Sequence, residues 1–64
     1  MSIFKEGDIV IRIKGEDTVK GMKKGEIHVV NKIFRPYKMT LVHKNGLWDM
    51  RNFSLIQEPN YEIY

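Results

Sequence analysis

The fold of this chain is decided by the stretch Ile9-Val10-Ile11-Arg12-Ile13, which begins after Gly7-Asp8 and stops at Lys14-Gly15. Four of its five residues are branched at Cβ, and such residues favour the pleated backbone of a strand over a helix. If Val10 points toward a core, its two isoleucine neighbours point away from it, because side chains alternate along a strand. The stretch therefore predicts a strand with apolar residues on both faces.

The rest of the chain repeats this pattern of short apolar runs separated by turn residues. The segment 15–25 is polar and holds three glycines, so it predicts a long loop. Arg35-Pro36 ends the second apolar run, because proline has no N–H to donate to a strand ladder. Asn45-Gly46, in the segment 44–46, lies between two apolar runs and favours a hairpin turn, because both residues accept a positive φ. The predicted strands cover residues 26–33, 38–43, 47–50 and 54–56, and the segment 49–53 suits one 3-10 turn.

Five short strands in so few residues are most economically closed as a small barrel, since closure removes the sheet edges that invite aggregation. We predict an all-β, five-stranded barrel over residues 1–57, followed by an aromatic and acidic tail over residues 58–64. One face of each strand is expected to fill the core. The predicted core consists of Phe4, Val10, Ile13, Ile27, Val30, Leu41, Trp48, Phe53 and Leu55.

The composition limits what such a chain can do. A domain of 64 residues buries only about 60% of the surface that its unfolded chain exposes, so its stability is marginal. No cysteine is present, which excludes a disulfide framework and a thiolate zinc site. No apolar run is long enough to cross a bilayer, and the first residues lack the basic and then apolar order of a signal peptide. We therefore expect an intracellular protein, for which oligomerisation is the remaining common source of stability.

The charge of the chain favours anionic partners. The net charge is +3 and the pI is about 9.3. Residues 1–56 hold all eleven lysines and arginines and only six acidic residues, an excess of five positive charges. The body of the protein is thus more basic than the whole chain, because Glu58 and Glu62 lie in the tail.

Several motifs of the chain occur together in one order and carry a resemblance. They are Phe4-Lys5-Glu6-Gly7-Asp8-Ile9-Val10, Arg12-Ile13, Gly21-Met22-Lys23-Lys24-Gly25-Glu26, Gly46-Leu47-Trp48-Asp49 and Arg51-Asn52-Phe53-Ser54-Leu55-Ile56. Over residues 3–57 this order resembles small, uncharacterised proteins of tailed bacteriophages that have an SH3-like (KOW-type) barrel. The resemblance implies an SH3-like fold and a site of action in the cytoplasm of an infected bacterial host. The chain departs from the family pattern at Ile9 and Ile11, where a polar outer residue is expected, and in its aromatic tail.

The residue pattern gives little support to catalysis. His28 and His43 lie within predicted strands, without a cysteine or a paired acid at a useful spacing, so we expect structural or surface histidines. A metal would need ligands from separate loops, and the usual ligand spacings do not occur. We predict a protein that is not an enzyme and that has no metal or cofactor.

Candidate ligand-binding residues combine positive charge with aromatic rings. Arg35-Pro36-Tyr37-Lys38 has the composition that grips phosphates and stacks bases, and a solvated loop is the alternative. Trp48 is either a core residue or an exposed stacking surface. The side chain of Arg12 either faces a ligand or pairs with Asp8 or Asp49. The predicted ligand-binding residues are Arg12, Arg35, Tyr37, Lys38, Trp48 and Arg51.

Three functions are compatible with these features. The first is a binding module that inhibits or decoys a host defence protein by stoichiometric binding, to which the small size, the apolar outer strand and the phage resemblance point. The second is a nucleic-acid-binding protein, supported by the basic body and the aromatic residues. The third is an oligomeric sponge that sequesters a small anionic nucleotide signal between subunits.

We also expect the protein to form a homo-oligomer. Water is a poor environment for two outward isoleucines, and a tail across the basic face of a neighbouring copy would bury its rings and pair its acids. The alternative is an unpacked tail, with the isoleucines covered by the loop 15–25. The predicted interface residues are Ile9, Ile11, Tyr61, Ile63 and Tyr64.

Overall fold

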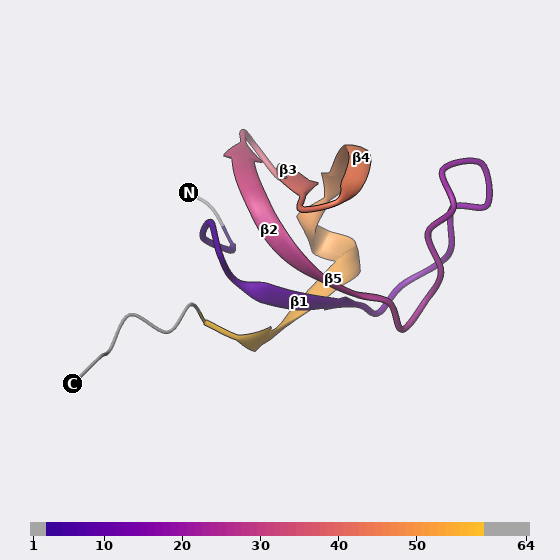
Figure 1. Cartoon of the computed structure of the whole chain (residues 1–64), viewed down its shortest axis with the longest axis horizontal. Coiled ribbons are helices and arrows are strands. Elements are labelled where there is room, and N and C mark those ends of the chain that lie inside the picture. Colours follow the sequence, from indigo (N-terminus) through magenta and orange to yellow (C-terminus); the bar gives the residue numbers. More distant parts are fainter. Residues whose placement is uncertain (1–2, 59–64) are drawn as a thin grey trace.

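A computed structural model describes residues 3–58 of the chain and contains five strands and one short helical turn (Figure 1). This confirms the predicted all-β class and the predicted 3-10 turn. The elements are β1 (Ile9–Arg12), β2 (Ile27–Phe34), β3 (Lys38–Leu41), β4 (Lys44–Asp49), η1 (Met50–Asn52) and β5 (Phe53–Gln57).

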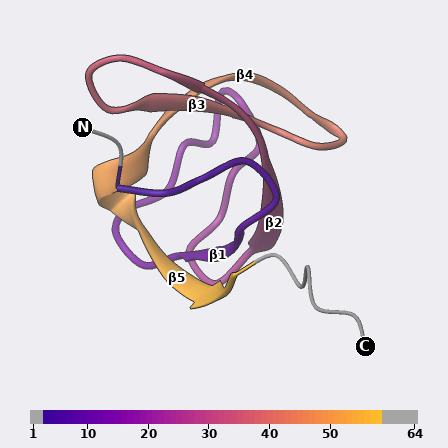
Figure 2. The same ribbon diagram turned by 90° about the vertical axis from the view of Figure 1, so that its left-hand side faces the viewer.

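The strands form one antiparallel sheet in the order β4-β3-β2-β1-β5. Strand β2 is the longest, and it pairs with β1 through its first half and with β3 through its second half. The register shifts between Val30 and Lys32, where the two halves meet. Figure 2 shows the strands curling around the centre of the molecule. The sheet has two edges, β4 and β5, so its ring of hydrogen bonds is open.

The core lies on the concave face of this sheet and contains six of the predicted residues. Three other predictions are wrong, because the side chains of Ile13, Ile27 and Leu55 are 48%, 58% and 42% exposed. Residues three apart on a strand point to opposite faces, so Ile27 cannot share the inner face of Val30 on β2. Ile13 lies beyond the end of β1, and Leu55 lies on the edge strand β5. The six confirmed core residues are Phe4, Val10, Val30, Leu41, Trp48 and Phe53.

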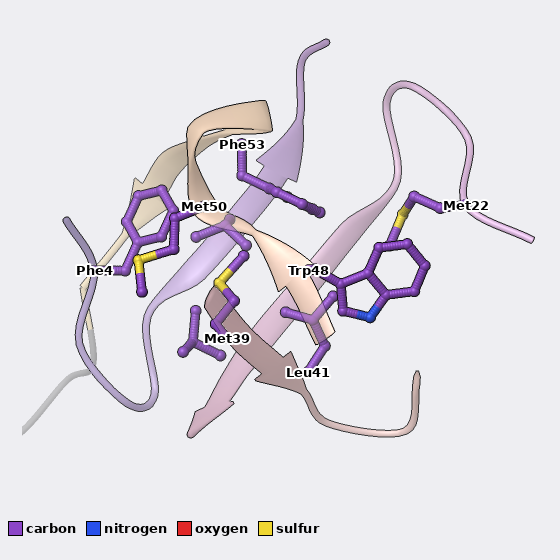
Figure 3. Close-up of a cluster of buried hydrophobic side chains, with 9 residues drawn as sticks. Phe4, Met22, Met39, Leu41, Trp48, Met50 and Phe53 are labelled. Atoms are coloured by element: carbon purple, nitrogen blue, oxygen red, sulfur yellow. The ribbon is translucent and has the colours of Figure 1, made fainter. Parts of the chain in front are cut away.

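Three methionines complete the core beside the six confirmed residues. Met22, Met39 and Met50 have no exposed surface and pack among the core rings (Figure 3). An unbranched, flexible thioether fits an irregular space between strands of different direction. Because methionine marks neither a strand nor a turn in a sequence, this part of the core was not predicted.

The turn of the β3–β4 hairpin differs from the predicted one. The last residue of β3 pairs with the first residue of β4, so the turn is Val42-His43. His43 has a φ of 63°, a left-handed conformation that histidine adopts more often than most residues do. The expected turn at Asn45-Gly46 is wrong, because these residues lie within β4 where the register shifts. The φ of 105° at Gly46 therefore serves a strand irregularity.

The segment 15–25 has no strand of its own but is packed against β4. Asp17 and Met22 form a bridge with two hydrogen bonds of 2.8 Å, and the side chain of Met22 enters the core. The Nζ atom of Lys20 donates to the carbonyl of Leu47 at 3.0 Å. The Nζ atom of Lys44 donates to the carbonyl of Gly21 at 2.7 Å. These contacts hold the segment over one end of the core.

Candidate binding surfaces

Branched apolar side chains gather on the outer face of β1 and β2. Ile9 pairs with Val29 and Ile11 pairs with Ile27, and directly paired residues share a face. Val42 lies beside Val29, to whose carbonyl it donates a hydrogen bond of 2.9 Å. Ile9 and Ile11 are half-buried, and the other three side chains are exposed. We call these five residues the apolar stripe.

The structure confirms the outward direction of Ile9 and Ile11, since Val10 between them is fully buried. It adds Ile27 and Val29, whose place on the same outer face follows from the pairing register. No local sequence pattern indicates this placement, because Val29 and Val30 are both apolar, and the pairing register decides which of them points outward. The other predicted interface residues lie outside the described residues, namely Tyr61, Ile63 and Tyr64.

A second surface is the cluster of Tyr37, Lys38, Asp49 and Arg51, which we call the Tyr37–Arg51 cluster. Asp49 caps η1 by accepting a 2.9 Å hydrogen bond from the backbone N–H of Arg51. The guanidinium of Arg51 donates to both carboxylate oxygens of Asp49, at 3.0 and 2.7 Å. Its carbon lies 4.7 Å from the centre of the Tyr37 ring. Lys38 lies opposite Asp49 in the sheet, with its Nζ atom 4.0 Å from the carboxylate.

The ion pair between Asp49 and Arg51 shifts the pKa of both residues. Hydrogen bonds from Arg51 hold the pKa of Asp49 well below its usual range. The same hydrogen bonds raise the pKa of Arg51. Asp49 thus stays ionised and cancels one of the three positive charges of Arg35, Lys38 and Arg51, which leaves an excess of two.

The turn that joins β2 to β3 brings this cluster together. The backbone N–H of Met50 donates to the carbonyl of Tyr37 at 2.7 Å and ties the turn to η1. Three predicted ligand-binding residues, Tyr37, Lys38 and Arg51, therefore lie on one surface, although Arg51 is far from the others in the sequence. Arg35 is exposed in the same turn, two residues before Tyr37.

Arg12 lies apart from this cluster and is buried. Its Nε donates to the carbonyl of Gly15 at 3.2 Å, and its guanidinium carbon lies 5.3 Å from the centre of the Phe53 ring. Within residues 3–58 it pairs with neither expected acid, since Asp8 accepts from the backbone of Lys5 and Asp49 accepts from Arg51. Arg12 thus joins the start of the segment 15–25 to β5.

Trp48 is a core residue, with 3% of its surface exposed. The indole packs beside Met22, as Figure 3 shows, and the ammonium of Lys20 lies 4.7 Å from the ring centre. Its buried Nε1 has no hydrogen-bond partner among the described residues. Of the two alternatives for Trp48, the structure supports the core residue, and Tyr37 is the predicted ring that remains exposed.

The histidines have structural surroundings. His28 Nε2 lies 2.8 Å from a carboxylate oxygen of Glu26, and this hydrogen bond lowers the pKa of Glu26. His43 occupies the hairpin turn.

No pocket of ligand size is present in residues 3–58, and no three metal-ligating side chains in that range come together. Both surfaces are therefore open faces.

Comparison with protein-family models, with curated proteins and with solved structures finds no match for this chain. Helices of the length and apolar composition needed to cross a membrane do not occur in the described part of the chain.

Proposed function

We propose that this protein is a non-catalytic binding module that docks through its apolar stripe on another protein. The resemblance to phage proteins supports a host defence factor as the partner, which the module would inhibit or decoy by stoichiometric binding. The proposed place of action is the cytoplasm of the infected bacterium. A nucleic-acid-binding protein and an oligomeric nucleotide sponge are the alternatives, and they would use the Tyr37–Arg51 cluster.

The observation that carries this proposal is the exposure of paired β-branched residues on the outer face of a regular ladder. Ile27 and Val29 lie on β2 directly opposite Ile11 and Ile9. Such side chains have few rotamers, and the paired strands hold their backbone, so little conformational entropy remains to be lost on binding. Contiguous apolar patches of this kind are typical of interaction sites. An open sheet face of this kind can pack against the surface of another protein.

The strand order also supports the assignment to an SH3-like barrel. Strand β5 returns to pair with β1, and η1 lies between β4 and β5. We propose that the open sheet is a variant of that barrel, in which edges β4 and β5 do not join. Barrels of this type host peptide, protein and nucleic-acid binding alike, so the surface decides between these functions.

The proposal is tested with a double variant, Ile27→Lys with Val29→Lys, which places two charges on the apolar stripe. The matched control is Val19→Lys, because Val19 is 95% exposed and lies in the segment 15–25. Proteins captured from host lysate are identified by mass spectrometry, and the purified partner is titrated by calorimetry. We expect binding with defined stoichiometry that the double variant weakens by at least about thirtyfold. The control should bind like the original protein.

The opposite result would contradict the proposal. If the double variant is folded and binds the purified partner with unchanged affinity, the apolar stripe is not the docking surface. Far-ultraviolet circular dichroism and thermal unfolding establish that each variant is folded. A partner that is lost only when Arg51 is replaced would move the docking surface to the Tyr37–Arg51 cluster.

A further inference from the structure

We infer that the Tyr37–Arg51 cluster is a binding site for nucleoside phosphates. The base would stack on the outer face of the Arg51 guanidinium, and Arg35 and Lys38 would bind the phosphate. This site is separate from the apolar stripe, so it does not depend on the proposed function.

The Arg51 guanidinium is held in place. Two hydrogen bonds to Asp49 fix the plane of the group, and the Tyr37 ring lies against it. The Arg51 side chain nevertheless remains 62% exposed. A fixed, exposed guanidinium plane can stack on a base, and its fixed position reduces the entropy lost on binding.

The Tyr37–Arg51 cation–π pair differs from the others in the described structure. Arg12 and Lys20 also lie over aromatic rings, but those rings belong to the buried residues Phe53 and Trp48. Tyr37, in contrast, is partly exposed in the turn after β2. The Tyr37–Arg51 pair is therefore the one that a ligand can reach in residues 3–58.

The positive charges near this pair differ in how far the fold engages them. Lys20 and Lys44 donate to backbone carbonyls, which engages these lysines within the fold. Arg35 is exposed and has no acidic partner in the described part of the chain. Arg35 lies in the turn two residues before Tyr37, and Lys38 lies beside Asp49, so the single carboxylate leaves a net positive charge near the stacking surface, as phosphate binding requires.

A second ring extends the surface along the sheet. Phe34 pairs with Lys38 across β2 and β3, so both side chains lie on the outer face. The Phe34 side chain is 44% exposed. The two accessible stacking surfaces, Arg51 and Phe34, fit two adjacent nucleotides of a single strand. A free nucleotide offers the same chemistry and would occupy one of these two surfaces.

Binding is measured by fluorescence anisotropy with labelled oligothymidylate of about ten nucleotides at about 50 mM salt. Arg51→Lys keeps the charge but removes the planar group, and Tyr37→Ala removes the ring beneath it. We expect each variant to weaken binding by about tenfold, the change typical for the loss of one stacked base. Arg35→Gln should lower the magnitude of the slope of log affinity against log salt by about 0.7, the value for one lost phosphate contact.

The matched controls are Lys24→Ala and Tyr37→Phe. Lys24 is exposed in the segment 15–25, and phenylalanine retains the ring of Tyr37, so both controls should bind nearly as tightly as the original protein. Adenosine monophosphate serves as a competitor. Displacement of the strand at about millimolar concentration indicates a site for free nucleotides, whereas binding of the strand alone indicates a site for single-stranded nucleic acid.

Two results would overturn the inference. One is the absence of binding to both the oligonucleotide and adenosine monophosphate at low salt. The other is binding that folded Arg51→Lys and Tyr37→Ala variants retain in full, since contact through scattered lysines would behave in that way. Thermal unfolding midpoints confirm that these variants are folded.

Discussion

Met22 lies in the middle of a polar segment and yet has no exposed surface. It packs beside Trp48 and closes one end of the core (Figure 3). Replacing it with alanine would leave a cavity and remove a tie between the segment 15–25 and the sheet. We expect Met22→Ala to lower the free energy of unfolding by about 2–3 kcal/mol in urea denaturation. Val19→Ala, in the same segment but at an exposed position, should change it by less than about 0.5 kcal/mol.

The ion pair between Asp49 and Arg51 should make the stability of the folded protein depend on pH. Hydrogen bonds from Arg51 hold the pKa of this carboxyl below its ordinary value of about 3.9. The ion pair therefore stabilises the folded protein above pH of about 4, and this contribution is lost as the pH falls from there toward the folded-state pKa. Carboxyl carbon NMR should show Asp49 ionised at a pH where exposed aspartates have taken up a proton. In Arg51→Gln its pKa should rise toward the ordinary value, and an unchanged titration would contradict this role of Arg51.

Among the elements, the β3–β4 hairpin has its turn at Val42-His43, and substitutions at His43 test this position. His43 has a positive φ in the turn, where glycine is favoured and a β-branched residue is strained. Within a strand the preference would be reversed, because valine favours strands and glycine weakens them. We expect His43→Val to be less stable than His43→Gly by about 1–2 kcal/mol in urea denaturation. A more stable valine variant would place the turn at Asn45-Gly46.

At the scale of the whole molecule, the apolar stripe is also available to a second copy of the chain when no partner is present. Burying paired branched residues would compensate for the small core of such a short domain. We expect light scattering at micromolar concentration to show a mass above the 7.6 kDa of one chain. Replacing Ile9 and Ile11 together with lysine should shift the protein toward monomer. A mass near 7.6 kDa for the original protein at this concentration would contradict self-association.

The predicted oligomer interface also includes the tail residues Tyr61, Ile63 and Tyr64. A chain that ends at Gln57 should dissociate at a higher concentration than the full chain if the tail contributes. Equal dissociation of the two chains would assign the contact to the strands alone. The purified binding partner should compete with self-association, since both would use the apolar stripe.

The sequence alone predicts the all-β class, the approximate limits of β1, β2 and β5, and the 3-10 turn before β5. These features depend on residues within a few positions of one another, such as the branched stretch at 9–13 and the stop at Arg35-Pro36. It also indicated that Ile9 and Ile11 point outward, because alternation along one strand is a local property.

Contacts between residues far apart in the sequence depend on the tertiary structure. It placed three methionines in the core and buried Trp48 beneath Lys20. It also joined Arg51 to Tyr37 and aligned Ile27 and Val29 with the outer residues of β1. No local preference contains this information, because it depends on the pairing register and on how the side chains of separate elements fill one space.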